Sequence, residues 1–286
     1  MKIPSPHPSA HRQSGQAAVE TALMMPLFIF LILGILQLGL MAQARIVGKY
    51  AVYRAARIGA MHHANTQAME AAAIFHLLPV LVNNSNSILP TDSTTNILRK
   101  YGRTLLENQL NRAGSIRPIQ IVICGPTSHE LRGTSSTDPL PNAGQTAMGG
   151  LGGNNEVDFD DPKLAVPGGT NPQTGRGMRL YNRLRLRVQL QWLYRMPIPF
   201  ANWIMTRIYI GASLPSVLMM NRRNQPPIAK FGRQANAVRF LAARGIYTIP
   251  INVSYAMRMQ SNFFLNRYRL PTKNDCIHYD PLTGQN

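Results

Sequence analysis

The residue with the clearest chemical role in the sequence is a single carboxylate, Glu20, which stands directly before a long uncharged segment. Gly15 precedes it, behind a short polar tail, MKIPSPHPSAHRQS. An unpaired carboxylate at the edge of an apolar segment is costly and usually functional. A secretory signal peptide has its small-residue cleavage site after the apolar region, whereas here the small residue comes before it. Cleavage between Gly15 and Gln16 would therefore leave the apolar segment on the mature protein, behind a new amine.

The segment that positions Glu20 runs from Thr21 to Ala44 without a charge. About 24 residues at a rise of ~1.5 Å give a helix of roughly 36 Å, enough to cross a hydrocarbon core of ~30 Å. The sequence predicts one long helix over 16–60 that contains Pro26 and becomes amphipathic beyond Ala44. The alternative, a buried core helix, would be shorter and interrupted by polar positions.

The stretch from Gly15 to Ala60 resembles the TadE-like domain of tight-adherence (Tad, or Flp) pilus systems. The matching features are Gly-Gln-Ala-Ala-Val-Glu at its start, the step Met25-Pro26, the glycines Gly34 and Gly39, and a closing Tyr-Arg-Ala-Ala-Arg-Ile-Gly-Ala pattern. Thr follows the glutamate where the family pattern often has Phe. The resemblance covers 15–60 and leaves most of the chain unmatched.

The resemblance implies a minor pilin or pseudopilin, whose leader (residues 1–15) a dedicated prepilin peptidase removes. Glu20 would then pair with the amine of Gln16 on a neighbouring subunit and set the axial register between the two. The implied partners are other pilin and pseudopilin subunits, the prepilin peptidase and an inner-membrane assembly platform. The implied location is the bacterial inner membrane, single-pass, with a cytoplasmic N-terminus and a periplasmic domain over 61–286, or the pilus fibre.

Counting basic residues on the two sides of the segment gives the opposite orientation. Lys2 and Arg12 precede it. The basic residues that follow it closely are Arg45, Lys49, Arg54 and Arg57. Because the side richer in Lys and Arg tends to stay in the cytoplasm, this count places the domain inside. We follow the resemblance, since a short N-terminal tail carries little weight in such a count.

The clearest strand lies between 179 and 194, where apolar and polar residues alternate with a period of two. One face carries Leu, Val, Trp and Tyr. The other face carries the arginines Arg179, Arg183, Arg185 and Arg187. These arginines are interpreted either as a solvated sheet face or as a platform for a polyanion.

The remaining segments complete an α+β domain that is pilin-like. Further helices are predicted at 66–82 and 94–113, and further strands at 117–124, 207–214 and 247–259. Pro250 places the last strand at an edge or a bulge. A Pro-containing loop is predicted at 221–234, and a Gly- and Pro-rich insertion at 125–178.

Charge defines the second functional hypothesis. The 286 residues include 30 Lys and Arg against 12 Asp and Glu, a net charge of +18. Such a balance suits anionic partners. The alternative to a pilin is therefore a signal-anchored envelope protein whose basic sheet binds polysaccharide, lipopolysaccharide or DNA. Nucleic acid has no support beyond charge.

The two cysteines, Cys124 and Cys276, have no Cys or His neighbour at metal-binding spacing. Export would allow a disulfide between them, and the alternative is two free thiols. An acidic cluster interrupts the basic chain at Glu156, Asp158, Asp160 and Asp161. Its spacing fits no EF-hand loop, so we interpret it as a solvated loop rather than a metal site.

The sequence offers no catalytic set and no cofactor motif. His62, His63 and His129 were considered as catalytic residues, but none belongs to a recognisable set. No Gly-x-Ser-x-Gly, His-Glu-x-x-His or Cys-x-x-Cys motif is present. The expectation is a protein that is not an enzyme and needs no cofactor.

Overall fold

The computed structural model describes residues 14–81, 93–110, 117–128, 156–157, 159, 185–212, 229–264, 268, 270–272 and 274–277. In chain order its elements are α1 (Ser14–Met61), α2 (Thr66–Leu77), α3 (Thr94–Leu110), β1 (Ile119–Gly125), β2 (Glu156–Val157), β3 (Arg185–Arg195), α7 (Ala201–Ala212), α8 (Ala229–Ala243), β4 (Thr248–Arg258) and β5 (Phe263–Phe264). A long apolar helix followed by further helices and an antiparallel sheet confirms the α+β class.

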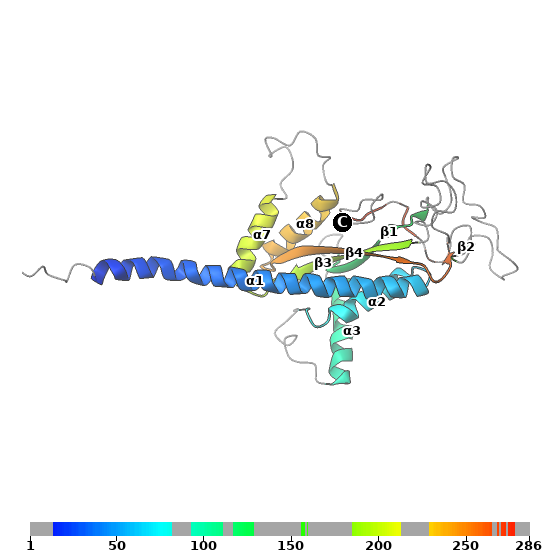
Figure 1. The fold of residues 1–286 in the computed structure, drawn as a ribbon, viewed down its shortest axis with the longest axis horizontal. Helices are drawn as coiled ribbons and strands as arrows, with labels where there is room; N and C mark the ends of the chain where they lie inside the picture. The colour runs from blue at the N-terminus through cyan, green and yellow to red at the C-terminus, as the bar shows by residue number, and fades with distance from the viewer. Residues whose placement is uncertain are drawn as a thin grey trace, which may run out of the picture.

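The first helix is one continuous element of 48 residues that passes through Pro26. It begins two residues before the predicted start, at Ser14, and it ends at Met61. About half of α1 extends from the rest of the molecule as an arm, and the other half lies along the domain (Figure 1).

The sheet has the order β1-β3-β4, and both pairings are antiparallel. Leu190 at its centre pairs with Ile121 on one side and with Val253 on the other. Pro250 of β4 pairs with Leu193 of β3, and β4 is an edge strand, one of the two placements that its proline predicted. A separate two-stranded ladder joins β2 to β5.

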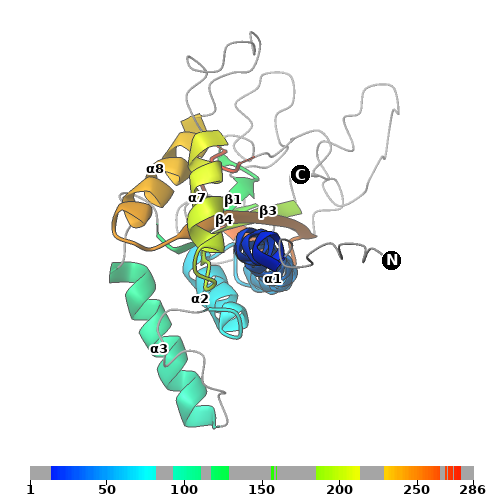
Figure 2. The same cartoon turned by 90° about the vertical axis from the view of Figure 1, so that its left-hand side faces the viewer.

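Two layers of helices enclose the sheet. Helices α1 and α2 cover one face, and α8 packs against β3 and β4 from the other (Figure 2). The apolar positions of β3 face α1: Gly59 of the helix lies against Leu186, and Gly48 lies against Leu190 and Val253. Period-two alternation therefore directs one face of β3 to the helix that carries Glu20.

Two of the predicted elements are wrong. Residues 207–214 were predicted as a strand, but 201–212 form α7, because a short apolar run does not distinguish a strand from a helix by periodicity. The predicted loop at 221–234 overlaps the start of α8, which was not predicted. Helices α2 and α3 and strands β1, β3 and β4 are confirmed within a few residues of their predicted ends. Most of the predicted insertion at 125–178 lies outside the described residues.

Candidate functional site: the two halves of the first helix

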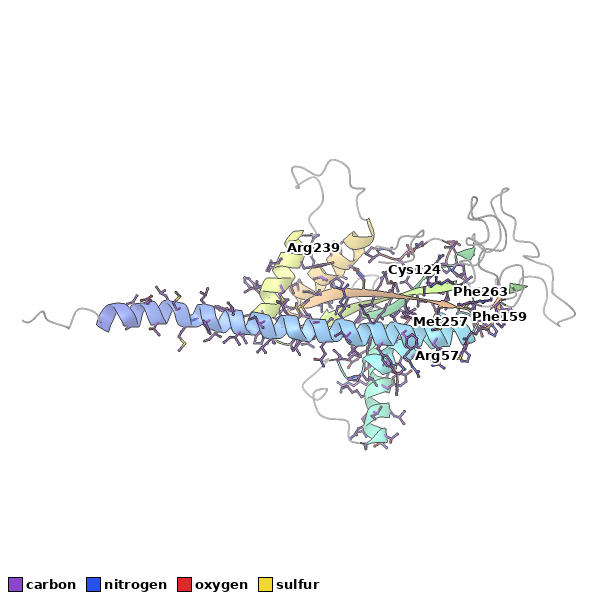
Figure 3. All side chains as sticks on the ribbon, in the orientation of Figure 1. Arg57, Cys124, Phe159, Arg239, Met257 and Phe263 are labelled. Carbon is purple, nitrogen blue, oxygen red and sulfur yellow. A yellow bond between two sulfur atoms is a disulfide. The ribbon has the colours of Figure 1, made fainter. Side chains whose placement is uncertain are left out.

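The N-terminal half of α1, Ser14–Leu36, is here called the free half. From Ala18 to Ile32 every side chain is exposed, for example 73% for Leu23 and 66% for Phe28. Figure 3 shows these side chains projecting around the arm with no other ribbon beside most of its length. In the described part of the chain, α1 is the one helix long and apolar enough to cross a membrane, over Ala18–Met61. A contiguous apolar surface of this size is stable only against lipid or against other apolar helices.

Glu20 lies near the start of the free half, and its side chain is exposed. Among the described residues, no hydrogen bond or ion pair involves the Glu20 side chain. Gly15 is also exposed and lies in the first turn of the helix, and a Cβ built there meets nothing within 4 Å. The predicted cleavage position and the predicted pairing carboxylate are therefore both accessible on the same short stretch of helix.

The C-terminal half of α1, Gln37–Met61, is here called the packed half. Most of its buried residues are small, and the buried alanines have no exposed surface: Ala44, Ala51, Ala55, Ala56 and Ala60. Small side chains allow the helix axis to approach the sheet closely, which is also why Gly59 contacts Met69 of α2 and Leu186 of β3. The packed half is thus the part of α1 that holds the domain.

A polar clamp fixes the end of the packed half. The carbonyl of Ala60 accepts hydrogen bonds from Gln260 N at 3.0 Å and from Ser261 Oγ at 2.8 Å. His63 N donates to Ser261 Oγ at 2.9 Å, and His63 Nδ1 lies 2.8 Å from the carbonyl oxygen of Asn262. The bonds to Ala60 satisfy a carbonyl group of the kind that a helix C-terminus leaves without a partner, and His63 N finds its acceptor just after the helix. His63 therefore has a structural role.

The two cysteines form a disulfide that fastens the C-terminal segment to the sheet. Cys124 lies at the end of β1, and its Cα is 5.3 Å from that of Cys276. Beside the disulfide, Gln189 Nε2 donates to the carbonyl of Ile277 at 2.7 Å, and Ile277 N donates to Gln189 Oε1 at 2.8 Å. The segment around Ile277 consequently covers the side of β3 opposite α1.

This covering changes the interpretation of the arginine face. Gln189 and Gln191, which share the polar face of β3, are buried, and Arg185 and Arg187 are partly buried. The Arg187 guanidinium lies against Gly125 of the neighbouring strand, so closely that a Cβ there would collide with it. Arg179 and Arg183 lie outside the described residues. The face was expected to be open to solvent, and at Gln189 and Gln191 it is not.

Neither a metal site nor a catalytic group emerges from the described ranges. No cluster of three or more His, Cys, Asp and Glu side chains occurs there. Of the acidic cluster, Glu156 pairs with Phe264 through the backbone, whereas Asp158, Asp160 and Asp161 lie outside the described part, as does His129. His62 is exposed, next to the clamped His63.

A buried polar cluster that the sequence did not indicate joins α2, α3 and β1. Asn108 of α3 exchanges two hydrogen bonds of 2.8 Å with the backbone of Ile119. Its amide also donates to Glu70 Oε1 at 2.9 Å, and Arg117 Nη1 forms an ion pair with the same oxygen at 2.7 Å. Burial raises the pKa of Glu70 above 4.5, and Arg117 opposes that rise. The residues are far apart in sequence, so no local pattern reveals the cluster.

The match to a known family falls on α1. A family model described as TadE-like protein matches residues 15–57. The first helix is TadE-like. The TadE-like segment thus contains the free half from Gly15 onward and most of the packed half, the same stretch on which the sequence resemblance rests. No curated protein and no solved structure matches the chain.

Proteins with a TadE-like domain are associated with the Tad pilus, and the match here covers residues 15–57 of the 286. The TadE-like family is a pilus component and not a family of enzymes. Its members belong with the other parts of the Tad pilus system, and α1 as a whole is long and apolar enough for a single-pass membrane anchor.

Proposed function

We propose that this protein is a minor pilin or pseudopilin of a Tad-type adhesive pilus. The free half of α1 holds it in the bacterial inner membrane before assembly and packs against other pilin helices afterwards. The domain over 61–286 is periplasmic, residues 1–15 form a cytoplasmic leader, and the prepilin peptidase cuts after Gly15. The partners are other pilin and pseudopilin subunits and the inner-membrane assembly platform.

One observation supports this proposal most strongly: the TadE-like segment carries an exposed apolar half helix with an unpaired carboxylate near its start. A lipid anchor alone needs no acidic group, and a carboxylate close to hydrocarbon is unfavourable without a partner. The amine that cleavage would create at Gln16 supplies such a partner on a neighbouring subunit. Pairing of the two charges would offset the desolvation of each and fix the stagger between helices.

The mass of the protein purified from membranes tests the cleavage. Cells with an active prepilin peptidase should yield a chain that lacks residues 1–15, and Gly15→Leu should yield the full-length chain. Gly34→Leu is the control, because a Cβ at Gly34, like one at Gly15, meets nothing within 4 Å. A full-length wild-type chain in such cells would contradict the pilin proposal and favour the uncleaved, polyanion-binding envelope protein.

The role of Glu20 is tested by Glu20→Ala and Glu20→Gln. Both variants should insert into the membrane normally, because the apolar run is unchanged, and both should fail to support normal pilus assembly. Glu20→Gln keeps the shape and polarity of the side chain, so its failure would assign the effect to the charge. Wild-type pilus levels in Glu20→Gln would refute the pairing.

A further inference from the structure

Helix α7 presents an apolar face that the domain leaves uncovered. Trp203, Ile204 and Ile208 are 48%, 41% and 65% exposed, and Phe200, just before the helix, is 61% exposed. Positions 203, 204, 207 and 208 fall on one side of a helix. The polar residue among them is Arg207, whose guanidinium lies over the Trp203 ring, 5.9 Å from its centroid.

The opposite face of α7 is attached to the domain and to α1. Ala201 and Thr206 are buried, and α7 packs against α8 and β4. The Phe200 ring contacts Phe30 of α1 edge to face, with centroids 5.7 Å apart. Close by, Ile198 N donates to Oε1 of the fully buried Gln37 at 3.2 Å. The position of α7 along α1 is thus set by contacts at residues 30 and 37.

The direction of α7 is as informative as its composition. It runs across the axis of α1 rather than along it (Figure 1). In Figure 2, which looks from the N-terminal end of α1, α7 stands in front of the sheet. Because α8 and β4 lie behind it, its uncovered face is turned toward the end of α1 that carries the apolar run. A helix placed in this way lies in the plane of any membrane that α1 crosses.

The length of the free half shows how close that membrane comes. From Thr21 to Leu36, the last residue before the buried Gln37, there are about 16 residues, or about 24 Å of helix. A hydrocarbon core of ~30 Å needs about 20 residues, so the arm alone is short by about 6 Å. The charge-free run makes up this length only beyond Gln37, at the level where α7 is attached. Interfacial helices lie ~5–10 Å into the boundary between headgroups and acyl chains, which matches the shortfall.

We propose that α7 is an interfacial helix whose Phe200, Trp203, Ile204 and Ile208 insert into the lipid leaflet on the domain side of the membrane. Phe200 and Trp203 supply the aromatic rings that favour the headgroup level, and Arg207 reaches the lipid phosphates from its position over Trp203. The helix thereby fixes the tilt of the domain on the bilayer. This inference rests on the membrane insertion of α1 in the proposed function.

Trp203 is a built-in probe of this contact. The chain has two tryptophans, and the other, Trp192, is 2% exposed within the sheet. The full-length protein is reconstituted into phospholipid vesicles with acyl chains brominated near the headgroup, brominated near the bilayer centre, or not brominated. We expect shallow bromines to reduce the tryptophan emission by about a third to a half, and deep bromines to reduce it less.

Trp203→Phe is the matched control, since it changes an exposed side chain and leaves Trp192 as the emitter. Emission from this variant should not respond to either brominated lipid. A second pair of variants tests the surface: Ile204→Asp with Ile208→Asp should abolish the lipid quenching of Trp203. Leu98→Asp with Leu106→Asp, on exposed positions of α3, should leave it unchanged.

Flotation of the vesicles separates failure of this inference from failure of the proposed function. A chain that does not float with the vesicles lacks a membrane-inserted α1, and both proposals fall. A chain that floats while Trp203 responds to aqueous acrylamide and not to brominated lipid refutes the interfacial helix alone. Protection of Trp203 from both quenchers would also refute it, since a second protein surface would then cover α7.

Discussion

The two halves of α1 belong to one unbroken helix, but the free half exposes large apolar side chains and the packed half buries mostly small ones. The free half presents Leu, Ile, Met and Phe in all directions, whereas most of the residues that the packed half buries are alanines and glycines. Lipid accepts large apolar side chains all round a helix, whereas a sheet at close approach requires small ones on one side. The comparison teaches that a single helix can be specified residue by residue for two environments, with the change at Gln37.

The largest expected effect comes from removing the disulfide, which should destabilise the domain and leave the free half of α1 in the membrane. Replacing both Cys124 and Cys276 with alanine should lower the domain's free energy of unfolding by about 2–5 kcal/mol, because the bond closes a long loop. The separation of 152 residues places the pair at the upper end of that range in the chain-entropy account. The measurement is urea unfolding followed by Trp192 emission in the Trp203→Phe background. Membrane extraction at alkaline pH should be unchanged, and loss of membrane retention would show that the halves are not independent.

Gly59→Ala compared with Gly34→Ala tests the packing difference directly. A Cβ at Gly59 would collide with Met69 and come within 2.8 Å of Leu186 Cδ2, whereas at Gly34 it meets nothing within 4 Å. Overpacking should cost about 1–3 kcal/mol at Gly59, partly offset by the better helix propensity of alanine. Gly34→Ala should change the unfolding free energy of the domain by less than about 0.5 kcal/mol. Equal effects in thermal unfolding would remove the distinction between the halves.

Gln37→Leu compared with Gln43→Leu locates the boundary. Gln37 is fully buried and accepts from Ile198 N, whereas its Nε2 has no hydrogen-bond partner in the structure. Leucine would leave the Ile198 amide without its acceptor while removing that unsatisfied group, so we expect a net loss of about 1 kcal/mol. Gln43 is exposed on the same helix, and Gln43→Leu should stay within about 0.5 kcal/mol. If both variants unfold alike in urea, the packed half begins after Gln37.

The smallest expected effect is a dependence of the domain's stability on pH, through Glu70 of α2. Burial raises the pKa of Glu70 above its unfolded value of 4.5, so the folded state binds this proton more tightly than the unfolded state does. The stabilisation from that proton is complete below pH 4.5 and is lost as the pH rises through the folded pKa. Glu70→Gln should flatten the fall in stability above pH 4.5, measured as the urea midpoint at a series of pH values. An unchanged slope would show that Arg117 cancels the effect of burial.

Much of this molecule follows from local sequence patterns. The length and apolarity of Thr21–Ala44 predict the long helix, and the alternation between 179 and 194 predicts the central strand, found at 185–195. Pro250 predicts an edge strand or a bulge, and β4 is an edge strand. The TadE-like features lie within the same first helix and are equally local. Patterns of this kind depend on the period of the helix or strand and on hydrophobicity, which each segment carries by itself.

The elements that local patterns missed depend on partners distant in sequence. Residues 207–214 were predicted as a strand, yet 207–212 continue α7, whose Thr206 is buried in the domain. The alternation in β3 predicts a polar face open to solvent. Gln189 on that face is nevertheless buried, because Ile277, far along the chain, exchanges two hydrogen bonds with it. Asn108, Glu70 and Arg117 likewise meet only after three elements have packed.

The sequence by itself determined that a charge-free helix with one carboxylate near its start leads an α+β domain, because helix length and apolarity are properties of a contiguous run. Only the tertiary structure decided where along that helix the domain attaches, and therefore how much of it stays exposed. Attachment depends on Gln37 meeting Ile198 and on Phe30 meeting Phe200, contacts between segments more than 150 residues apart. Those contacts fix the position of α7 along α1, and no single segment of the sequence determines it.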